Sequence, residues 1–201
     1  TLENLKSTWE KASFLRAILN SLYVTVCSLV LTVFFSSAAS YQIARFSTSF
    51  TNVCFNIFIF SMAIPPIIST IPLYILMRRV NAINTLWGMV LLYSASSMPF
   101  AIFLYTNFIR ATDPQIEEAA IIDGCSEFSA FWYVLFPILK PITATVILLN
   151  TVSFWNEYGR AVFFLQRQEK FTVPLAISVF MQKYTANWEL MASGALIGMI
   201  P

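Results

Sequence analysis

Three long runs of uncharged residues divide the first half of the chain. They cover 28, 32 and 30 residues, between Arg16 and Arg45, between Arg45 and Arg78, and between Arg79 and Arg110. A helix needs roughly 20 mainly apolar residues to cross the hydrocarbon core of a bilayer. Each run therefore predicts one membrane-spanning helix with a short polar connection.

The predicted spans cover residues 17–39, 53–77 and 86–109, and a less clean fourth covers residues 141–164. The first span ends in the small cluster "SSAAS", which favours close helix packing. A final apolar segment, "LMASGALIGMIP", has 12 residues and is too short to cross. We expect the sequence to stop inside a helix. The predicted fold is an all-α, polytopic transmembrane helical bundle with about four full spans and one truncated span.

The second predicted span contains prolines in "AIPPIISTIP", namely Pro65, Pro66 and Pro72. Each proline lacks an amide hydrogen and disrupts the helical bonding around it. At membrane depth the freed carbonyl groups need other partners. A broken helix, as found in transporters, and a static kink both remain open interpretations.

The fourth span ends in "FWNEYGR", where Glu157 and Arg160 lie three residues apart. On a helix, this spacing places the two side chains on one face, where they can pair. Ionisable residues at membrane depth often serve a function. The alternative, which we prefer, is an interfacial anchor beside Trp155 and Tyr158.

Composition agrees with a membrane protein in contact with lipid. Hydrophobic residues make up 58% of the chain and charged residues 11%, against about 45–50% and about 25% in ordinary globular proteins. No basic cluster is longer than the Arg78–Arg79 pair, so nothing indicates a nucleic-acid partner. The chain has no histidine and its three cysteines are far apart, so no metal set or disulfide framework is predicted.

Half of the ten acidic residues fall within fifteen positions that contain no basic residue. These are Asp113, Glu117, Glu118, Asp123 and Glu127. The pattern predicts a helix capped by Asp113 with Pro114 at its first position, ended by Gly124 in a left-handed conformation. Ser126 can cap a second helix, "EFSAFWYVLF", that ends against Pro137 and Pro141. A well-capped helix–turn–helix of this charge is typical of a docking element at the membrane surface, and no nucleophile or metal ligand accompanies it to indicate an enzyme.

The same stretch resembles the EAA signature of membrane subunits of ATP-binding-cassette (ABC) importers. That signature reads Glu-Ala-Ala, three residues, Gly, nine residues, then Ile, any residue and Leu-Pro. The matching positions are Glu118, Ala119, Ala120, Gly124 and Pro137, with Val134 in place of Ile and Phe136 in place of Leu. The stretches "IPLYILMRRVNAINTLWGMVLLY" and "SFWNEYGRAVFFL" are similar to the carbohydrate-uptake branch, and the resemblance covers essentially the whole chain.

The resemblance implies a single permease domain, residues 1–201, incomplete at both ends, whose coupling loop, residues 112–139, docks on a separate ATPase. It implies that ATP and Mg²⁺ bind to an ABC ATPase dimer, and that this chain binds no cofactor. The chain lacks a GxxxxGK[ST] phosphate loop, as a subunit that borrows ATP hydrolysis would. The implied coupling residues are Glu117, Glu118, Ala119, Ala120, Asp123, Gly124, Val134 and Pro137.

Further partners implied by the resemblance are a second homologous permease subunit, an extracytoplasmic solute-binding protein and a sugar. The outer loop, residues 166–189, would contact the binding protein through Lys170, Phe171, Thr172, Val173 and Pro174. Candidates for the transport pathway or its gates are Pro65, Pro66, Pro72, Tyr93, Asn150, Trp155 and Glu157. The implied location is the cytoplasmic membrane of a prokaryote, with the EAA loop in the cytoplasm.

The number of basic residues on each side of the membrane opposes this orientation. With the EAA loop inside, only Arg45, Arg110 and Lys140 would lie on the cytoplasmic side, against the usual positive-inside bias. Two alternatives also remain: an importer subunit for an amino acid, peptide or phosphate, and an ion-coupled secondary transporter. The latter predicts intramembrane carboxylates or inverted repeats, and the first three spans carry no charge.

Overall fold

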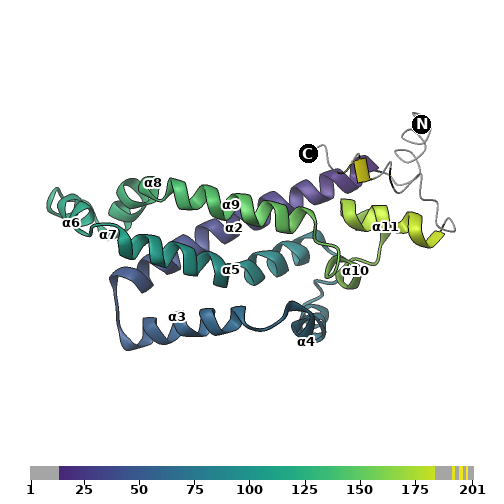
Figure 1. Ribbon diagram of the computed structural model, residues 1–201, viewed down its shortest axis with the longest axis horizontal. Coiled ribbons are helices and arrows are strands. Elements are labelled where there is room, and N and C mark those ends of the chain that lie inside the picture. The colour runs from purple at the N-terminus through teal and green to yellow at the C-terminus, as the bar shows by residue number, and fades with distance from the viewer. Residues whose placement is uncertain (1–13, 184–191, 193–194, 197, 199–201) are drawn as a thin grey trace. The chain divides into compact units, whose positions relative to one another are not determined.

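The computed structural model describes residues 14–183, 192, 195, 196 and 198, and all regular structure within them is helical (Figure 1). The predicted all-α class is confirmed. Most of the last apolar segment, predicted as a truncated span, lies outside the described residues. Contacts divide the chain into two compact units, one drawn from residues 1–28, 67–93 and 151–201, the other from residues 29–66 and 94–150.

Two helices are each long and apolar enough to cross a membrane. Helix α2 covers Phe14–Arg45 and helix α5 covers Leu86–Ala111, so both predicted spans form and extend beyond their predicted ends. Pro99 lies inside α5 without ending it. Counting each bent helix pair as one span gives up to four spans in the described chain, so the predicted number of spans stays a prediction.

The second predicted span is broken rather than kinked. Helix α3 covers Ser49–Met62 and helix α4 covers Pro66–Arg79, with Pro65 in the break between them. Pro66 begins α4, where its missing amide removes no helical bond, whereas Pro72 lies inside that helix. The carboxyl-terminal side of the break is therefore a new helix.

The fourth predicted span is shorter than expected. Helix α9 covers Lys140–Trp155, and the chain then turns before the short helix α10, Ala161–Phe164. The segment after it includes the predicted outer loop, residues 166–189. It contains a 3₁₀ turn at Gln168–Lys170 and the eleven-residue helix α11, Val173–Lys183.

In the first unit, the start of α2 packs against the start of α11. Phe14 and Ala17 form a buried cluster with Val173 and Ala176. Polar groups hold the same contact, because the Asn20 amide donates hydrogen bonds of 3.0 Å to the carbonyls of Glu169 and Phe171. The segment before α11 is thus fastened to α2.

In the second unit, the end of α2 packs against α5 through small polar residues. Ser36, Ser37 and Ser40 are fully buried, which confirms the predicted close packing of the "SSAAS" cluster. The Ser40 hydroxyl donates to the Ile102 carbonyl at 3.1 Å, and Thr32 shares a 3.0 Å hydrogen bond with Ser97. Larger side chains fill the core beside these contacts, including Tyr41, Tyr105, Ile109 and Val146.

Candidate functional site

The acidic segment begins with a short helix beyond the end of α5. Helix α6 covers Gln115–Ile122, one residue later than predicted, with Pro114 just before it. The Asp113 carboxylate still accepts the Gln115 amide at 3.0 Å. The predicted cap is therefore one residue off: Pro114 is the N-cap, and its carbonyl accepts the first helical bonds, from Glu117 and Glu118.

Gly124 ends α6 as predicted. Its φ is +94°, and the Gly124 amide donates to Ile121 while the Cys125 amide donates to Ala120. These two bonds form the Schellman motif, in which a left-handed residue lets the chain satisfy the last helical carbonyls. The turn is thus fixed by backbone bonds.

The second arm begins at Ser126 and is more complex than predicted. The Ser126 hydroxyl accepts the Ser129 amide at 3.2 Å and caps helix α7, Glu127–Ser129. A π-helical turn follows at Ala130–Leu135, and helix α8 then covers Phe136–Ile138. The prediction that Pro137 ends this arm is wrong.

The π-helical turn explains how the helix continues through Pro137. The Phe136 amide bonds to Phe131, five residues back, so the backbone widens where a proline ring would otherwise meet the preceding turn. The arm ends at Leu139 instead, and α9 leaves from it at an angle of 72°. The loop therefore turns sharply into the next helix.

Aromatic packing fixes this second arm to the second unit. Phe131 and Leu135 are buried in the cluster around Tyr41, and Trp132 stacks on Phe34 with ring centroids 5.3 Å apart. Large side chains in defined aromatic contacts make the arm a rigid support for α6.

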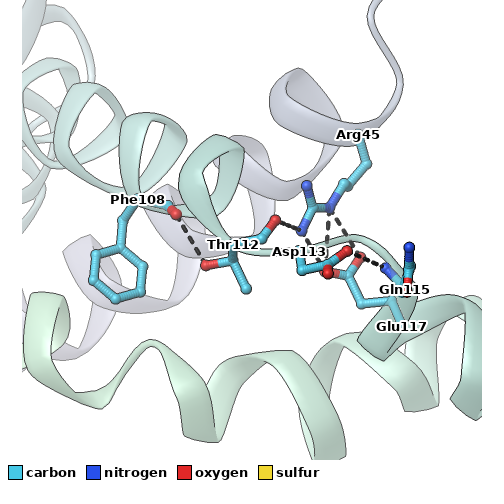
Figure 2. A network of polar contacts seen from close by, with 6 residues as sticks. All are labelled: Arg45, Phe108, Thr112, Asp113, Gln115 and Glu117. Carbon is cyan, nitrogen blue, oxygen red and sulfur yellow. Dashed lines mark hydrogen bonds and ion pairs between the residues drawn. The ribbon is translucent and has the colours of Figure 1, made fainter.

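One ion pair fixes α6 itself (Figure 2). The Arg45 guanidinium at the end of α2 contacts both oxygens of Glu117, at 3.1 Å from Nε and 2.7 Å from Nη2. Its Nη2 also donates to the Thr112 carbonyl, just beyond α5, at 3.0 Å. The side chain of Glu117 is 6% exposed, so this carboxylate meets a partner within the chain rather than an outside one.

The remaining predicted coupling residues lie mainly on the surface. Glu118, Ala119, Asp123, Gly124 and Pro137 are exposed, and Ala120 and Val134 are half-buried. Beside them stand large exposed apolar side chains that the sequence interpretation did not select, Ile121, Ile122, Phe128 and Tyr133. Ile122 and Tyr133 are at least 80% exposed. We call Glu118, Ile121, Ile122, Asp123 and Phe128 the docking face.

Three predicted pathway residues of the first unit, Tyr93, Trp155 and Glu157, are buried or half-buried. Tyr93 is fully buried, stacked on Phe154 and covered by the Arg160 guanidinium 5.3 Å from its ring centre. Arg160 pairs with Glu157 at 2.6 Å, but the two residues lie in the turn after α9. The predicted pairing is correct, but the prediction that both residues lie on a helix is wrong. The Glu157 carboxylate also accepts the Arg160 backbone amide, which stabilises the turn. Trp155 donates to the Gly198 carbonyl at 3.1 Å.

The other pathway candidates differ in exposure. Pro65, Pro66 and Pro72 are exposed. Asn150 is buried in the second unit, where its amide donates to the Val146 carbonyl of the same helix at 2.8 Å. No group of three or more potential metal-binding side chains occurs among the residues that the structure describes.

Two of the five residues predicted to contact a binding protein are not exposed in this structure. Thr172 and Val173 are buried because α11 packs on α2, and the Val173 amide donates to the Ser21 hydroxyl at 2.9 Å. Lys170, Phe171 and Pro174 are half-buried. The exposed positions nearby are the preceding residues, Gln166, Arg167, Gln168 and Glu169.

A family model described as the inner membrane component of binding-protein-dependent transport systems matches residues 32–200. The match covers both arms of the acidic loop and most of the predicted spans. The chain belongs to this family.

Several relatives of this permease are named as sugar transport proteins. It is 37% identical over its full length to the melibiose/raffinose/stachyose import permease protein MelC of Bacillus subtilis, covering 73% of that protein. It is 30% identical, again over its full length, to the probable starch degradation products permease AmyC of Thermoanaerobacterium thermosulfurigenes, covering 73% of it. The arabinooligosaccharides permease AraQ of Bacillus subtilis is 28% identical over 90% of the chain and 64% of that protein.

A solved structure shares the fold of the permease. It is the crystal structure of a bacterial ABC transporter that imports the acidic polysaccharide alginate, with a TM-score of 0.81 and 23% identity, over 96% of this chain and 73% of that one. The expected ABC importer permease fold is thus confirmed. The predicted ABC importer family is likewise confirmed, together with an inner-membrane location.

Sequence reasoning missed the residue that holds the loop in place. Arg45 marked only the boundary between two uncharged runs, although a lone arginine at a helix end is a natural partner for a first-turn carboxylate. The exposed side chains of Phe128 and Tyr133 were read as part of an apolar helix. Their exposure depends on which face of the second arm packs inward, and the π-helical turn shifts that face.

Proposed function

We propose that this permease moves a sugar or oligosaccharide across the cytoplasmic membrane, driven by an ABC ATPase dimer that docks on the acidic loop. In this proposal a solute-binding protein delivers the sugar outside the cell, and a second homologous permease subunit completes the pathway. The docking loop lies in the cytoplasm.

The observation that carries this proposal is the combination of a rigid frame and an exposed docking face. Both arms have fixed ends, α6 through its Schellman turn and α7 through its Ser126 cap. Yet Ile122 and Phe128 are 85% and 72% exposed at the junction of the two arms. Large apolar side chains exposed on a rigid, charged element favour burial against a protein partner.

The charges of the docking face indicate the chemistry of that partner. Glu118 and Asp123 are exposed and form no ion pair with any residue that the structure describes, whereas Glu117 is paired internally. A cleft with an apolar floor and a basic rim would complement Ile122 and these two carboxylates. The ATPase subunit is expected to supply it.

Support for a sugar as the solute comes from the relatives. MelC, AmyC and AraQ are named for oligosaccharides of different composition, so the names agree on a class but not on one compound. Permeases for an amino acid, a peptide or phosphate share the acidic loop, and the transported solute distinguishes them.

The test is co-purification of the full-length permease from membranes of its own host in mild detergent. Wild type is compared with Ile122→Glu, which adds a charge to the apolar centre of the docking face. Gln168→Glu adds the same charge to an exposed position remote in sequence from the loop and serves as the control. We expect wild type and the control to recover an ATPase, and Ile122→Glu to recover at least about tenfold less, since each tenfold corresponds to about 1.4 kcal/mol of binding free energy.

Uptake in cells then identifies the solute. Melibiose, raffinose, maltotriose and an arabinooligosaccharide are compared with an amino acid and phosphate, in a strain lacking the permease and in the same strain with the gene restored. Restored uptake of a sugar alone supports the proposal, and restored uptake of an amino acid or phosphate alone contradicts the sugar class. Recovery of no ATPase with wild type contradicts the ABC mechanism and makes ion-coupled transport the next hypothesis.

A further inference from the structure

Arg45 connects the ends of three helices. It is the last residue of α2, it contacts Glu117 in the first turn of α6, and it donates to the Thr112 carbonyl immediately after α5. Figure 2 shows the guanidinium between this carbonyl and the carboxylate. One side chain therefore sets where α6 lies relative to both membrane helices.

The contact with Arg45 involves the one buried side chain of helix α6. Glu117 is the only residue of α6 that is buried, and the other side chains of the helix are exposed or half-buried. A force on the exposed face of α6 can reach α2 through the covalent chain only by way of α5 and two further helices. The ion pair links α6 to α2 directly, whereas the aromatic contacts of Phe34 and Tyr41 link α2 to the second arm.

The geometry of the pair makes this path stiff. Both carboxylate oxygens receive hydrogen bonds from one planar guanidinium, which fixes orientation as well as distance. With the Glu117 side chain 6% exposed and the Arg45 side chain 14% exposed, water screens the attraction little. A lysine would keep the charge but lose the two-pronged geometry.

We propose that Arg45 is a positioning residue for energy coupling: through Glu117 it transmits displacement of α6 by the docked ATPase to α2. This inference rests on the proposed function. It separates two roles within one acidic cluster, in which Glu118 and Asp123 face the ATPase and Glu117 faces the membrane helix.

The test measures transport and ATP hydrolysis per assembled complex. The full-length permease, with its co-purifying subunits, is reconstituted into lipid vesicles, with radiolabelled raffinose as the first probe or another sugar that wild type takes up. The variants are Arg45→Lys, Arg45→Gln and Glu117→Gln. Arg110→Gln is the matched control, because Arg110 lies in the last turn of α5 and its guanidinium contacts the Phe55 ring instead of α6.

We expect all four variants to retain the ATPase at nearly the wild-type ratio, because none alters the docking face. Raffinose transported per ATP hydrolysed should fall at least about tenfold in the three pair variants, Arg45→Lys included, and remain within about twofold of wild type in Arg110→Gln. A merely structural role would lower the yield of complex and leave this ratio unchanged.

A single neutralisation leaves an uncompensated buried charge and can prevent folding. The double variant Arg45→Met, Glu117→Leu removes both charges and keeps apolar volume, which often preserves stability. We expect it to assemble and to hydrolyse ATP with transport still uncoupled. Arg45→Glu alone should lower the raffinose transported per ATP hydrolysed. The charge-exchanged variant, Arg45→Glu with Glu117→Arg, should restore part of that loss.

Normal transport per ATP in the double apolar variant would overturn the inference, since packing alone would then suffice. Loss of the ATPase from the pair variants, with an unchanged ratio in the complexes that remain, would overturn it as well. Neither result would contradict the proposed function, which fails only if wild type recovers no ATPase or transports no sugar.

Discussion

Gly124 has a backbone conformation that other residues adopt only at a cost. Its φ of +94° lies outside the left-handed helical well that asparagine tolerates, and no other atom lies within 4 Å of where a Cβ would stand. Any effect of adding a methyl group here must therefore come from the backbone and not from a clash. This makes Gly124 a clean probe of how much the shape of the turn matters.

We expect Gly124→Ala to destabilise the turn by about 1–2 kcal/mol, because the Cβ then opposes the positive φ. The Schellman bonds should weaken, and ATPase recovery at limiting ATPase should fall several-fold. Gly159→Ala is the control, because a Cβ there meets only the Glu157 carboxylate at 3.5 Å, with no positive φ. Co-purification at graded ATPase concentration measures the effect, and equal recovery from both variants would show that the turn tolerates another shape.

At the scale of elements, the turn between α4 and α5 is built around a glycine with no free space. A Cβ on Gly88 would lie 2.8 Å from the Thr85 hydroxyl and closer still to the Ala82 carbonyl. The turn itself contains two residues with positive φ, Asn81 and Asn84. Asn84 is fixed further, since its backbone amide donates to the Phe164 carbonyl at 2.9 Å. The turn cannot move without disturbing the segment after α10.

Gly88→Ala should therefore destabilise the first unit by about 1–3 kcal/mol, the usual cost of an added group in a filled space. The expected result is a lower unfolding temperature in detergent and less protein in the membrane, compared with the Gly159→Ala control. The docking face lies in the other unit and should be unaffected per folded molecule. A wild-type unfolding temperature would mean that the turn relaxes at no cost.

The sequence predicted correctly those elements that depend on interactions between near neighbours in the chain. Gly124 ends α6 and Ser126 caps α7 because each acts through neighbours in sequence. Uncharged runs predicted α2 and α5 for a similar reason, since hydropathy along one helix needs no knowledge of its neighbours.

The elements that were predicted wrongly depend on contacts between residues far apart in the sequence. Proline was expected to end the second arm at Pro137, yet a π-helical turn packed by Phe131 and Leu135 carries the helix past it. The segment containing Val173 was expected to face outward, and packing on Phe14 buries it. Glu117 was grouped with the exposed carboxylates because nothing local to it indicates Arg45, 72 residues earlier.

At the scale of the whole molecule, charge and motif disagree about orientation. The positive-inside tendency would place most basic residues in the cytoplasm. With the docking loop inside, Arg45, Arg110 and Lys140 are the basic residues on that side. Arg45 is moreover paired with Glu117, which leaves the loop surface acidic. The proposed docking to a cytoplasmic ATPase requires the loop inside nevertheless, and the rule describes a tendency rather than a fixed requirement.

Cysteine labelling in whole cells distinguishes the two orientations. Replacing Cys27, Cys54 and Cys125 by alanine gives a background for two single-cysteine variants, Glu118→Cys on the docking face and Gln168→Cys before α11, both at exposed positions. A membrane-impermeant maleimide should label Gln168→Cys in intact cells, and Glu118→Cys only after the membrane is permeabilised. The cysteine-free background controls for labelling elsewhere, and the unfolding temperature of each variant in detergent shows that its fold is intact. The reverse pattern would place the docking face outside the cell, beyond the reach of ATP, and would show that the charge count had indicated the orientation correctly.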